Sequence, residues 1–283
     1  MSLGERFRGL LDLTRPGNTI AAALLTATGV FVAAPDALLG GQREAVAAVA
    51  ATACATAAGN AVNDYFDREI DRINRPDRAI PRGAVSPRGA LAFSLLLFLA
   101  AVVAAAALPV VAIAIAVTNL LALVAYTKLF KGLPGVGNAV VAYLTGSTFL
   151  FGAASVGWVS DAVVLFLLAA VATFTREVVK DVEDIDGDRK QGLRTLPIVV
   201  GERRALWVGV AAMALAILAS PVPYVYGTLG LVYIVLVVPA DALMLGAALQ
   251  SFRDPSVGQR RLKLGMFLAA GAFIAGRATG ALL

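Results

Sequence analysis

Two groups of three aspartates are the residues of this chain best placed to do chemistry. Both groups have the spacing i, i+3 and i+7, with Asp64, Asp67 and Asp71 in the first and Asp181, Asp184 and Asp188 in the second. At about 100° per residue, each trio falls within roughly 60° of one helix face. Carboxylates crowded at a helix end repel one another unless cations bind there, and hard oxygen atoms favour Mg²⁺. The two trios therefore predict two magnesium sites.

Basic residues follow each acidic trio. They are Arg68, Arg72, Arg75, Arg78 and Arg82 after the first trio and Arg189, Lys190 and Arg194 after the second. Proteins usually hold Mg²⁺ through a few carboxylates together with substrate phosphates, and guanidinium groups pair with phosphate oxygens. We therefore expect two Mg²⁺ ions bridged by one substrate diphosphate. A solvated loop of mixed charge is the alternative, but such a loop requires neither the shared spacing nor its repeat.

The composition excludes most other catalytic chemistries. The 283 residues contain no histidine, which excludes imidazole bases and histidine-ligated zinc, and the single cysteine, Cys54, has no partner for a disulfide. Hydrophobic residues make up 59% of the chain and charged residues 15%, whereas soluble domains are about half apolar and one quarter charged. The composition thus predicts a membrane protein.

The elements that must position the trios are apolar stretches of about membrane length. A helix needs roughly 20 mainly apolar residues to cross the hydrocarbon core. Nine such spans are expected, in residues 16–35, 45–63, 89–127 (two spans that turn at Pro109), 132–160, 162–180, 205–250 (two spans that turn near Pro221 and Pro223) and 262–283. The sequence predicts an all-α polytopic membrane protein with nine transmembrane helices, the first retained and not cleaved as a signal peptide.

The distribution of basic residues predicts the orientation in the membrane. Lys and Arg collect on cytoplasmic loops. In this chain 22 of the 24 fall at the N-terminus or in alternate loops, and only Arg43 and Arg277 fall on the other side. We expect the N-terminus and both trios on the cytoplasmic side of the cell membrane and the C-terminus outside. The net charge of +5 then reflects topology, and no nucleic-acid partner is expected.

The motifs resemble those of the UbiA superfamily of intramembrane prenyltransferases over essentially the whole chain. Residues 63–71, NDYFDREID, are similar to the family motif NDxxDxxxD, and residues 181–188 to its second acidic motif. The loop at 74–83, NRPDRAIPRG, is similar to NRPxRPIxxG, with Ala79 where many members have a second proline. The resemblance implies one membrane domain over residues 1–283, with two related halves at about 1–130 and 131–283 and nine helices around a central cavity. It also implies Mg²⁺-dependent ionisation of a prenyl diphosphate and transfer of the prenyl cation to an acceptor.

The resemblance also implies roles for individual residues. The metal sites are assigned to Asn63, Asp64, Asp67, Asp71, Asp181, Asp184 and Asp188, of which Asp67, Asp71, Asp184 and Asp188 are also catalytic candidates. The candidate diphosphate ligands are Arg15, Asn18, Arg75, Arg78 and Lys131. Lys128 is the alternative to Lys131 in holding the leaving group, and Tyr126 is expected to turn its ring toward the cation. Topology alone explains any single arginine, and an interfacial tyrosine belt explains Tyr126 equally well.

The identity of the two substrates is the most specific prediction. Residues 15–18, residues 142–147 and the arginine-rich loop are most similar to archaeal members of the superfamily. This likeness implies geranylgeranyl diphosphate as donor and the glycerol hydroxyl of geranylgeranylglyceryl phosphate as acceptor, giving the second ether bond of archaeal membrane lipids. Another lipophilic acceptor, in particular an aromatic one such as 4-hydroxybenzoate, is the main alternative. A secondary transporter is a third interpretation, because Asp241 lies inside a span, where an acid is costly unless it functions, is paired or reaches water.

Overall fold

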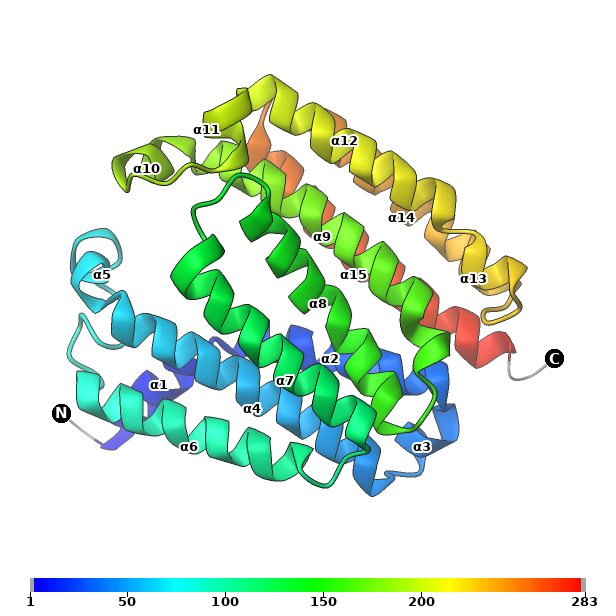
Figure 1. The fold of residues 1–283 in the computed structure, drawn as a ribbon, viewed down its shortest axis with the longest axis horizontal. Helices are drawn as coiled ribbons and strands as arrows, with labels where there is room; N and C mark the ends of the chain where they lie inside the picture. The colour runs from blue at the N-terminus through cyan, green and yellow to red at the C-terminus, as the bar shows by residue number, and fades with distance from the viewer. Residues whose placement is uncertain (1–2, 281–283) are drawn as a thin grey trace.

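The structure is a computed structural model that describes residues 3–280, without the side chains at positions 3, 70, 74, 127 and 128. Every regular element in this range is a helix (Figure 1). The prediction of an all-α fold is therefore confirmed.

Nine long helices make up most of the described chain. They are α2 (Pro16–Ala33), α4 (Arg43–Phe66), α6 (Pro87–Ala105), α7 (Val110–Ala125), α8 (Val136–Ser155), α9 (Val163–Glu183), α12 (Glu202–Ala219), α14 (Leu231–Gln250) and α15 (Pro255–Gly280). Eight of them are long and apolar enough to cross a membrane. The remaining one, α7, is a shorter apolar helix that continues into a π-helical turn, η1 (Tyr126–Phe130). The predicted bundle of membrane helices is confirmed, with α7 as its least regular span.

Shorter helices precede or connect the long ones. They are α1 (Leu3–Thr14), α3 (Pro35–Leu39), α5 (Arg68–Asn74), η2 (Val159–Ala162), α10 (Ile185–Lys190), α11 (Leu196–Val200) and α13 (Val222–Val225). The predicted turns lie at prolines, since Pro109 caps α7 and Pro221 caps α13. Proline fixes φ and lacks an N–H, so it starts a helix more readily than it continues one.

The last long helix begins earlier than predicted. α15 starts at Pro255 and not at residue 262, because Oδ1 of Asp254 accepts a hydrogen bond from the backbone N–H of Val257 at 3.0 Å. A carboxylate cap followed by proline at the first helical position is a strong helix start. Lys263 and its basic neighbours consequently lie on a helix and not in a loop.

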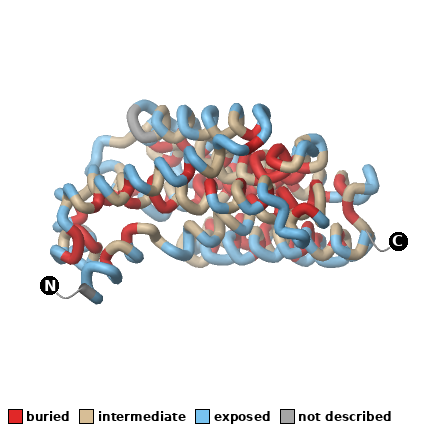
Figure 2. The backbone as a smooth tube through the Cα atoms, turned by 90° about the horizontal axis from the view of Figure 1, so that it is seen from below, coloured by how far each residue is buried: buried red, intermediate tan, exposed pale blue. Residues whose placement is uncertain are grey.

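Small residues let the central helices approach closely. A Cβ atom on Gly152 of α8 would lie 2.2 Å from the carbonyl oxygen of Thr26 in α2, and one on Gly29 would lie 2.3 Å from that of Phe149. Close approach at small residues is how helices pack in lipid, where no hydrophobic effect drives them together. Buried segments lie in the interior of the bundle and exposed ones on its outside (Figure 2). The outside includes large apolar side chains such as Leu218, which is 78% exposed, as expected for contact with lipid.

Candidate active site

The two acidic motifs have the same local backbone structure. α4 ends at Phe66, α5 begins at Arg68, and the junction residue Asp67 has φ −84° and ψ 3°. In the second motif Asp184 joins α9 to α10 with φ −92° and ψ 5°. The short helices α5 and α10 lie at the same end of the bundle (Figure 1), which we call the motif end.

This break corrects one prediction. An uninterrupted helix would carry all three aspartates of a trio on one face, but a ψ near 0° ends the helix at the middle aspartate. Asp71 and Asp188 therefore lie on separate short helices. The turn is closed by hydrogen bonds, since the backbone N–H of Asp71 donates to the carbonyl oxygen of Asp67 at 2.9 Å and that of Asp188 to Asp184 at 3.0 Å.

Two arginines form ion pairs with two aspartates of the first trio. Asp64 and Asp71 are buried, and Nη1 of Arg78 donates to Oδ2 of Asp71 at 2.6 Å and to Oδ1 of Asp64 at 3.2 Å. The guanidinium of Arg15 donates to the same oxygen of Asp64. Within residues 3–280, Arg15 is the one non-glycine residue with a positive φ, 47°. Such a conformation costs about 1–3 kcal/mol and persists only where the surroundings fix it. The fold thus brings these four predicted residues together.

A polar pocket of about 810 Å³ opens beside these ion pairs. Its lining is mostly charged: Glu5, Arg8, Asp12, Arg15, Asp64, Arg75, Asp77, Arg78 and Arg82, with Asn18, Ala79 and Ala84. Arg15, Asn18, Arg75 and Arg78 were all predicted to bind a diphosphate, and they line one pocket. The fifth candidate, Lys131, is not part of this lining.

The second trio is hydrogen-bonded to α8 through Asp181, and the loop that follows the trio is joined to the loop after η1. Nδ2 of Asn138 donates to Oδ2 of Asp181 at 2.8 Å. The backbone N–H of Arg194 donates to the carbonyl oxygen of Gly132 at 3.1 Å, which joins the loop after α10 to the loop after η1. Asp184 is exposed at its junction. The second trio therefore has an uncharged amide where the first has guanidinium groups.

Electrostatics place Tyr126 and Lys131 beside the second trio. Burial raises the pKa of the Asp188 carboxyl and the charge of Asp184 raises it further, whereas the ammonium of Lys131 opposes the shift. Tyr126 lies within reach of the charges of Glu177, Asp181 and Asp188. Both predicted residues lie close to the acids of the second trio, so Lys131 is near a different motif from the arginines.

The donor set suits Mg²⁺. Within the described residues, no three acidic side chains form a group that could hold a metal ion by themselves. Proteins, however, usually bind Mg²⁺ through one or two carboxylates and complete the shell with water and substrate phosphates. Nη1 of Arg78 already contacts both Asp64 and Asp71, so a single cationic centre can reach these two carboxylates. Asn63 and the half-buried Asp67 supply further oxygen atoms in the same motif.

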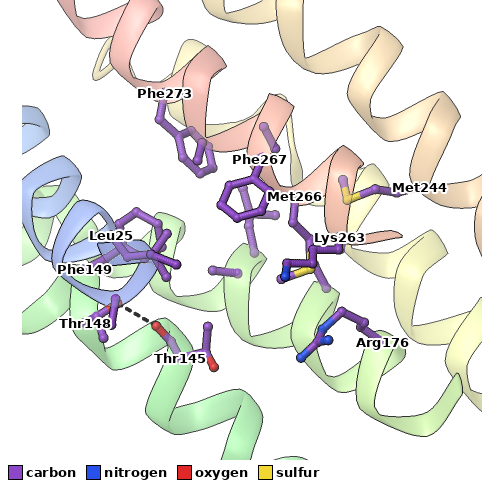
Figure 3. A pocket seen from close by; sticks show the side chains of 18 of the residues that line it. Leu25, Thr145, Thr148, Phe149, Arg176, Met244, Lys263, Met266, Phe267 and Phe273 are labelled. Carbon is purple, nitrogen blue, oxygen red and sulfur yellow. Dashed lines mark hydrogen bonds between the residues drawn. The ribbon is translucent and has the colours of Figure 1, made fainter. Parts of the chain in front are cut away.

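An apolar cavity of about 430 Å³ lies between α2, α8, α9, α14 and α15 (Figure 3). Leu25, Phe149, Phe267 and Phe273 form part of its wall. Asn18 lines both this cavity and the polar pocket, so the two spaces meet near the start of α2. Together they offer a charged compartment next to a hydrocarbon compartment.

Asp241 belongs to the wall of this cavity and is buried, with 7% of its surface exposed. Oγ of Ser220 donates a hydrogen bond to its carboxylate, and the hydroxyl of Tyr233 donates to the carbonyl oxygen of Ser220 at 2.7 Å. Of the interpretations open from the sequence, a paired acid inside the bundle is the one that this geometry fits.

The sequence matches the family described as the UbiA prenyltransferase family over residues 19–271. The chain belongs to this family. A digeranylgeranylglyceryl phosphate synthase of Haloquadratum walsbyi is 60% identical over 273 residues, 96% of this chain and 95% of that protein. One from Natronomonas pharaonis is 61% identical over 274 residues, 96% of this chain and 98% of that protein.

Solved structures agree with this membership. A structure described for digeranylgeranylglyceryl phosphate synthase in membranes has a TM-score of 0.82 at 33% identity and covers 97% of this chain and 99% of its own. A UbiA homolog from Archaeoglobus fulgidus bound to GPP and Mg²⁺ shares the fold, with a TM-score of 0.70 at 20% identity over 95% of this chain and 99% of its own. The family expected from the motifs is confirmed.

Sequence reasoning missed two cations of the cavity. Arg176 of α9 and Lys263 of α15 line it, and neither belonged to a predicted motif. The signal that could have found Lys263 is the helix start at Asp254 and Pro255, which places Lys263 about two turns inside a span. Of the residues that were predicted, Lys128 has a side chain that lies outside the described part of the structure.

Proposed function

We propose that the chain transfers a geranylgeranyl group from geranylgeranyl diphosphate to the glycerol hydroxyl of geranylgeranylglyceryl phosphate in a Mg²⁺-dependent reaction. The observation that carries this proposal is the meeting of an arginine-lined pocket and an apolar cavity at Asn18. An isoprenoid diphosphate has one charged end and one hydrocarbon end, and each finds its own compartment. The two relatives named for this activity match 96% of the chain at 60% and 61% identity, which supports the same substrates.

In this proposal Arg15, Arg75 and Arg78 bind the diphosphate. Guanidinium groups donate paired hydrogen bonds to phosphate oxygens. Without substrate, Arg15 and Arg78 are held by Asp64 and Asp71, so they are pre-placed at the pocket and exchange a carboxylate partner for a phosphate partner. Two Mg²⁺ ions, one at each acidic motif, would supply neutralisation of the leaving diphosphate.

The transfer breaks the bond between the prenyl C1 atom and the diphosphate oxygen and forms an ether bond from C1 to the acceptor oxygen. Diphosphate departs with the bonding electrons, and as the ether forms the hydroxyl proton passes to the departing diphosphate. The apolar cavity keeps water away from the allylic cation, which water would otherwise capture. Tyr126, beside the second trio, can turn its ring toward the developing positive charge, and Lys131 can pair with the leaving group.

We also infer that the motif end faces the cytoplasm of the cell membrane and that the C-terminus is external. This orientation follows from the 22 of 24 basic residues that collect on one side, since positive charge is retained on the cytoplasmic side. It puts the polar pocket in contact with the compartment that supplies soluble Mg²⁺.

A product assay with competing acceptors tests the proposal. Purified protein receives geranylgeranyl diphosphate and Mg²⁺ together with geranylgeranylglyceryl phosphate and 4-hydroxybenzoate, and mass spectrometry identifies the product. We expect the lipid that carries two geranylgeranyl chains on one glycerol phosphate. A prenylated benzoate would keep the chemistry but overturn the acceptor, and no product from either acceptor would overturn the proposed function.

A further inference from the structure

Two cations on the wall of the apolar cavity have no part in the diphosphate site described above. Arg176 of α9 and Lys263 of α15 both extend toward the cavity in Figure 3, next to apolar side chains such as Met266 and Phe267. A charged side chain inside a membrane span is costly, faces the interior of the bundle and as a rule marks a substrate path or site. Two such cations on one cavity therefore indicate that the cavity binds an anionic group.

Both cations lie at a similar depth below the motif end. The first turn of α15 is tied to the last turn of α9, because Oγ of Ser256 donates to the carboxylate of Glu183 and Nε2 of Gln259 donates to it at 3.4 Å. At 1.5 Å per residue, Lys263 lies about 12 Å along α15 from its start and Arg176 about 10 Å along α9 from its end. The two side chains thus approach the cavity from adjacent helices at one level.

The two cavity cations differ in their partners. The Arg176 guanidinium donates to Glu177, and Nζ of Lys180 lies 3.8 Å from the same carboxylate. Lys180 also acts on two carboxylates of the second trio, so its charge is opposed there. Lys263 forms no ion pair or hydrogen bond with any residue in the described part of the chain. Lys263 is therefore a cation of the cavity wall that can pair with an anionic group of a bound molecule.

We propose that Arg176 and Lys263 bind the phosphate of the acceptor lipid, an inference that rests on the proposed function. The donor diphosphate occupies the arginine-lined pocket on the side of α2, α4 and α5, so a second anionic group in the same active site needs cations of its own. The acceptor is a phosphate monoester attached to a long apolar chain. The cavity presents two cations at one level and the rings of Phe267 and Phe273 for the chain.

This placement orients the acceptor for reaction. The glycerol lies between its own phosphate, held on α9 and α15, and the donor diphosphate, held beside α2. Its free hydroxyl is then the group nearest to the prenyl C1 atom, and the two anions are kept apart by separate sets of cations. Arg176 and Lys263 would in this way set the preference for a phosphorylated acceptor over a neutral one, because specificity is a difference between two binding free energies.

The test compares two acceptors that differ only in the phosphate, geranylgeranylglyceryl phosphate and geranylgeranylglycerol. kcat/KM is measured for both with the parent protein, Lys263→Gln, Arg176→Gln and the control Arg260→Gln, which removes an arginine of the same helix as Lys263 that does not line the cavity. We expect each cavity variant to lose roughly 10- to 100-fold in kcat/KM with the phosphorylated acceptor and little with the neutral one. The KM for geranylgeranyl diphosphate should not change, and Arg260→Gln should behave as the parent.

Equal losses with both acceptors would overturn the inference, because they would indicate a structural role. A rise in the KM for the donor alone would overturn it too, because the cations would then serve the diphosphate. If a neutral variant does not fold, Lys263→Arg and Arg176→Lys are measured instead. These variants keep the positive charge and should keep the preference for the phosphorylated acceptor. Loss of that preference in both of them would also overturn the inference. Absence of ether product from the parent protein would instead refute the proposed function.

Discussion

Removing the Arg78 guanidinium should make the metal-free protein less stable and more responsive to Mg²⁺. Arg78→Gln takes away the hydrogen-bonded cation of Asp71 and leaves Asp64 with Arg15 alone. The two carboxylates are 6% and 5% exposed, so little water can replace the lost contacts. Removing one partner of a buried ion pair costs about 3–5 kcal/mol. Because the Arg78 side chain is itself 19% exposed, we expect about 3 kcal/mol.

Mg²⁺ should reverse this loss. In the parent protein a cation at the first motif has to displace Nη1 of Arg78 from Asp64 and Asp71, whereas in the variant Asp71 is free and Asp64 keeps only Arg15. A ligand that binds only the folded state stabilises it by RT ln(1 + [L]/Kd), about 2.7 kcal/mol at one hundred times Kd. Because the variant binds Mg²⁺ more tightly, its folded state should be stabilised more than that of the parent at each Mg²⁺ concentration. Turnover should still fall by about 10²- to 10³-fold, because a donor to the leaving diphosphate is lost.

Thermal unfolding in detergent, first in EDTA and then over a Mg²⁺ titration, measures both effects. At about 2–4 °C per kcal/mol, the midpoint of Arg78→Gln in EDTA should lie about 6–12 °C below that of the parent. Arg72→Gln is the matched control, since Arg72 pairs with Glu69 at 60% and 63% exposure and such pairs contribute about 0–1 kcal/mol. Equal Mg²⁺-induced rises in the variant and the parent would refute the exchange of guanidinium for metal. An unchanged midpoint in EDTA would refute the assigned cost.

EDTA should stop formation of the ether product and added Mg²⁺ should restore it in the mass-spectrometric assay; turnover in EDTA would contradict a role for the metal. Asp67→Ala and Asp184→Ala should each lower turnover by at least about 100-fold while the size-exclusion profile of the protein is unchanged, and full activity in either variant would remove that carboxylate from the mechanism. Gly152→Ala should reduce the thermal stability, because its methyl group would lie 2.2 Å from the carbonyl oxygen of Thr26, whereas Gly246→Ala points into open space and serves as control. Equal midpoints for these two glycine variants would show that α2 and α8 can separate without cost.

The spans could be predicted because a membrane helix leaves a simple trace, about 20 residues without charge. The same criterion fails at helix ends that carry charge. α15 runs through Arg260 and Lys263 because its start is fixed by the cap at Asp254, and an apolar run gives no sign of this. The amphipathic helix α1 was missed for the same reason, although its Leu13 is completely buried.

The acidic residues could be predicted from spacing, but their partners could not. Arg15 is 49 residues from Asp64, and Asn138 is 43 residues from Asp181. Contacts between residues so far apart in the sequence depend on which helices pack side by side. A single sequence indicates that arrangement only where it resembles a family of known fold. The break at the middle aspartate was missed because helical periodicity alone favours continuation, whereas the fold ends both helices at Asp67 and Asp184.

The two motifs share a spacing but not an electrostatic environment. Guanidinium groups donate hydrogen bonds to Asp64, whereas Asp181 accepts one from the uncharged amide of Asn138. Lys180 and Lys131 act on the second motif without a hydrogen bond to its aspartates in the described residues. A divalent cation therefore has no hydrogen-bonded guanidinium to displace at the second motif, and we expect it to bind more tightly there than at the first motif in the absence of substrate. At the first motif, a cation can bind the carboxylates only as Arg15 and Arg78 leave them, and those arginines leave readily only when a diphosphate accepts their hydrogen bonds. Metal and substrate binding at the first motif are therefore coupled, because the metal replaces the arginines as partner of the carboxylates while the diphosphate replaces the carboxylates as partner of the arginines.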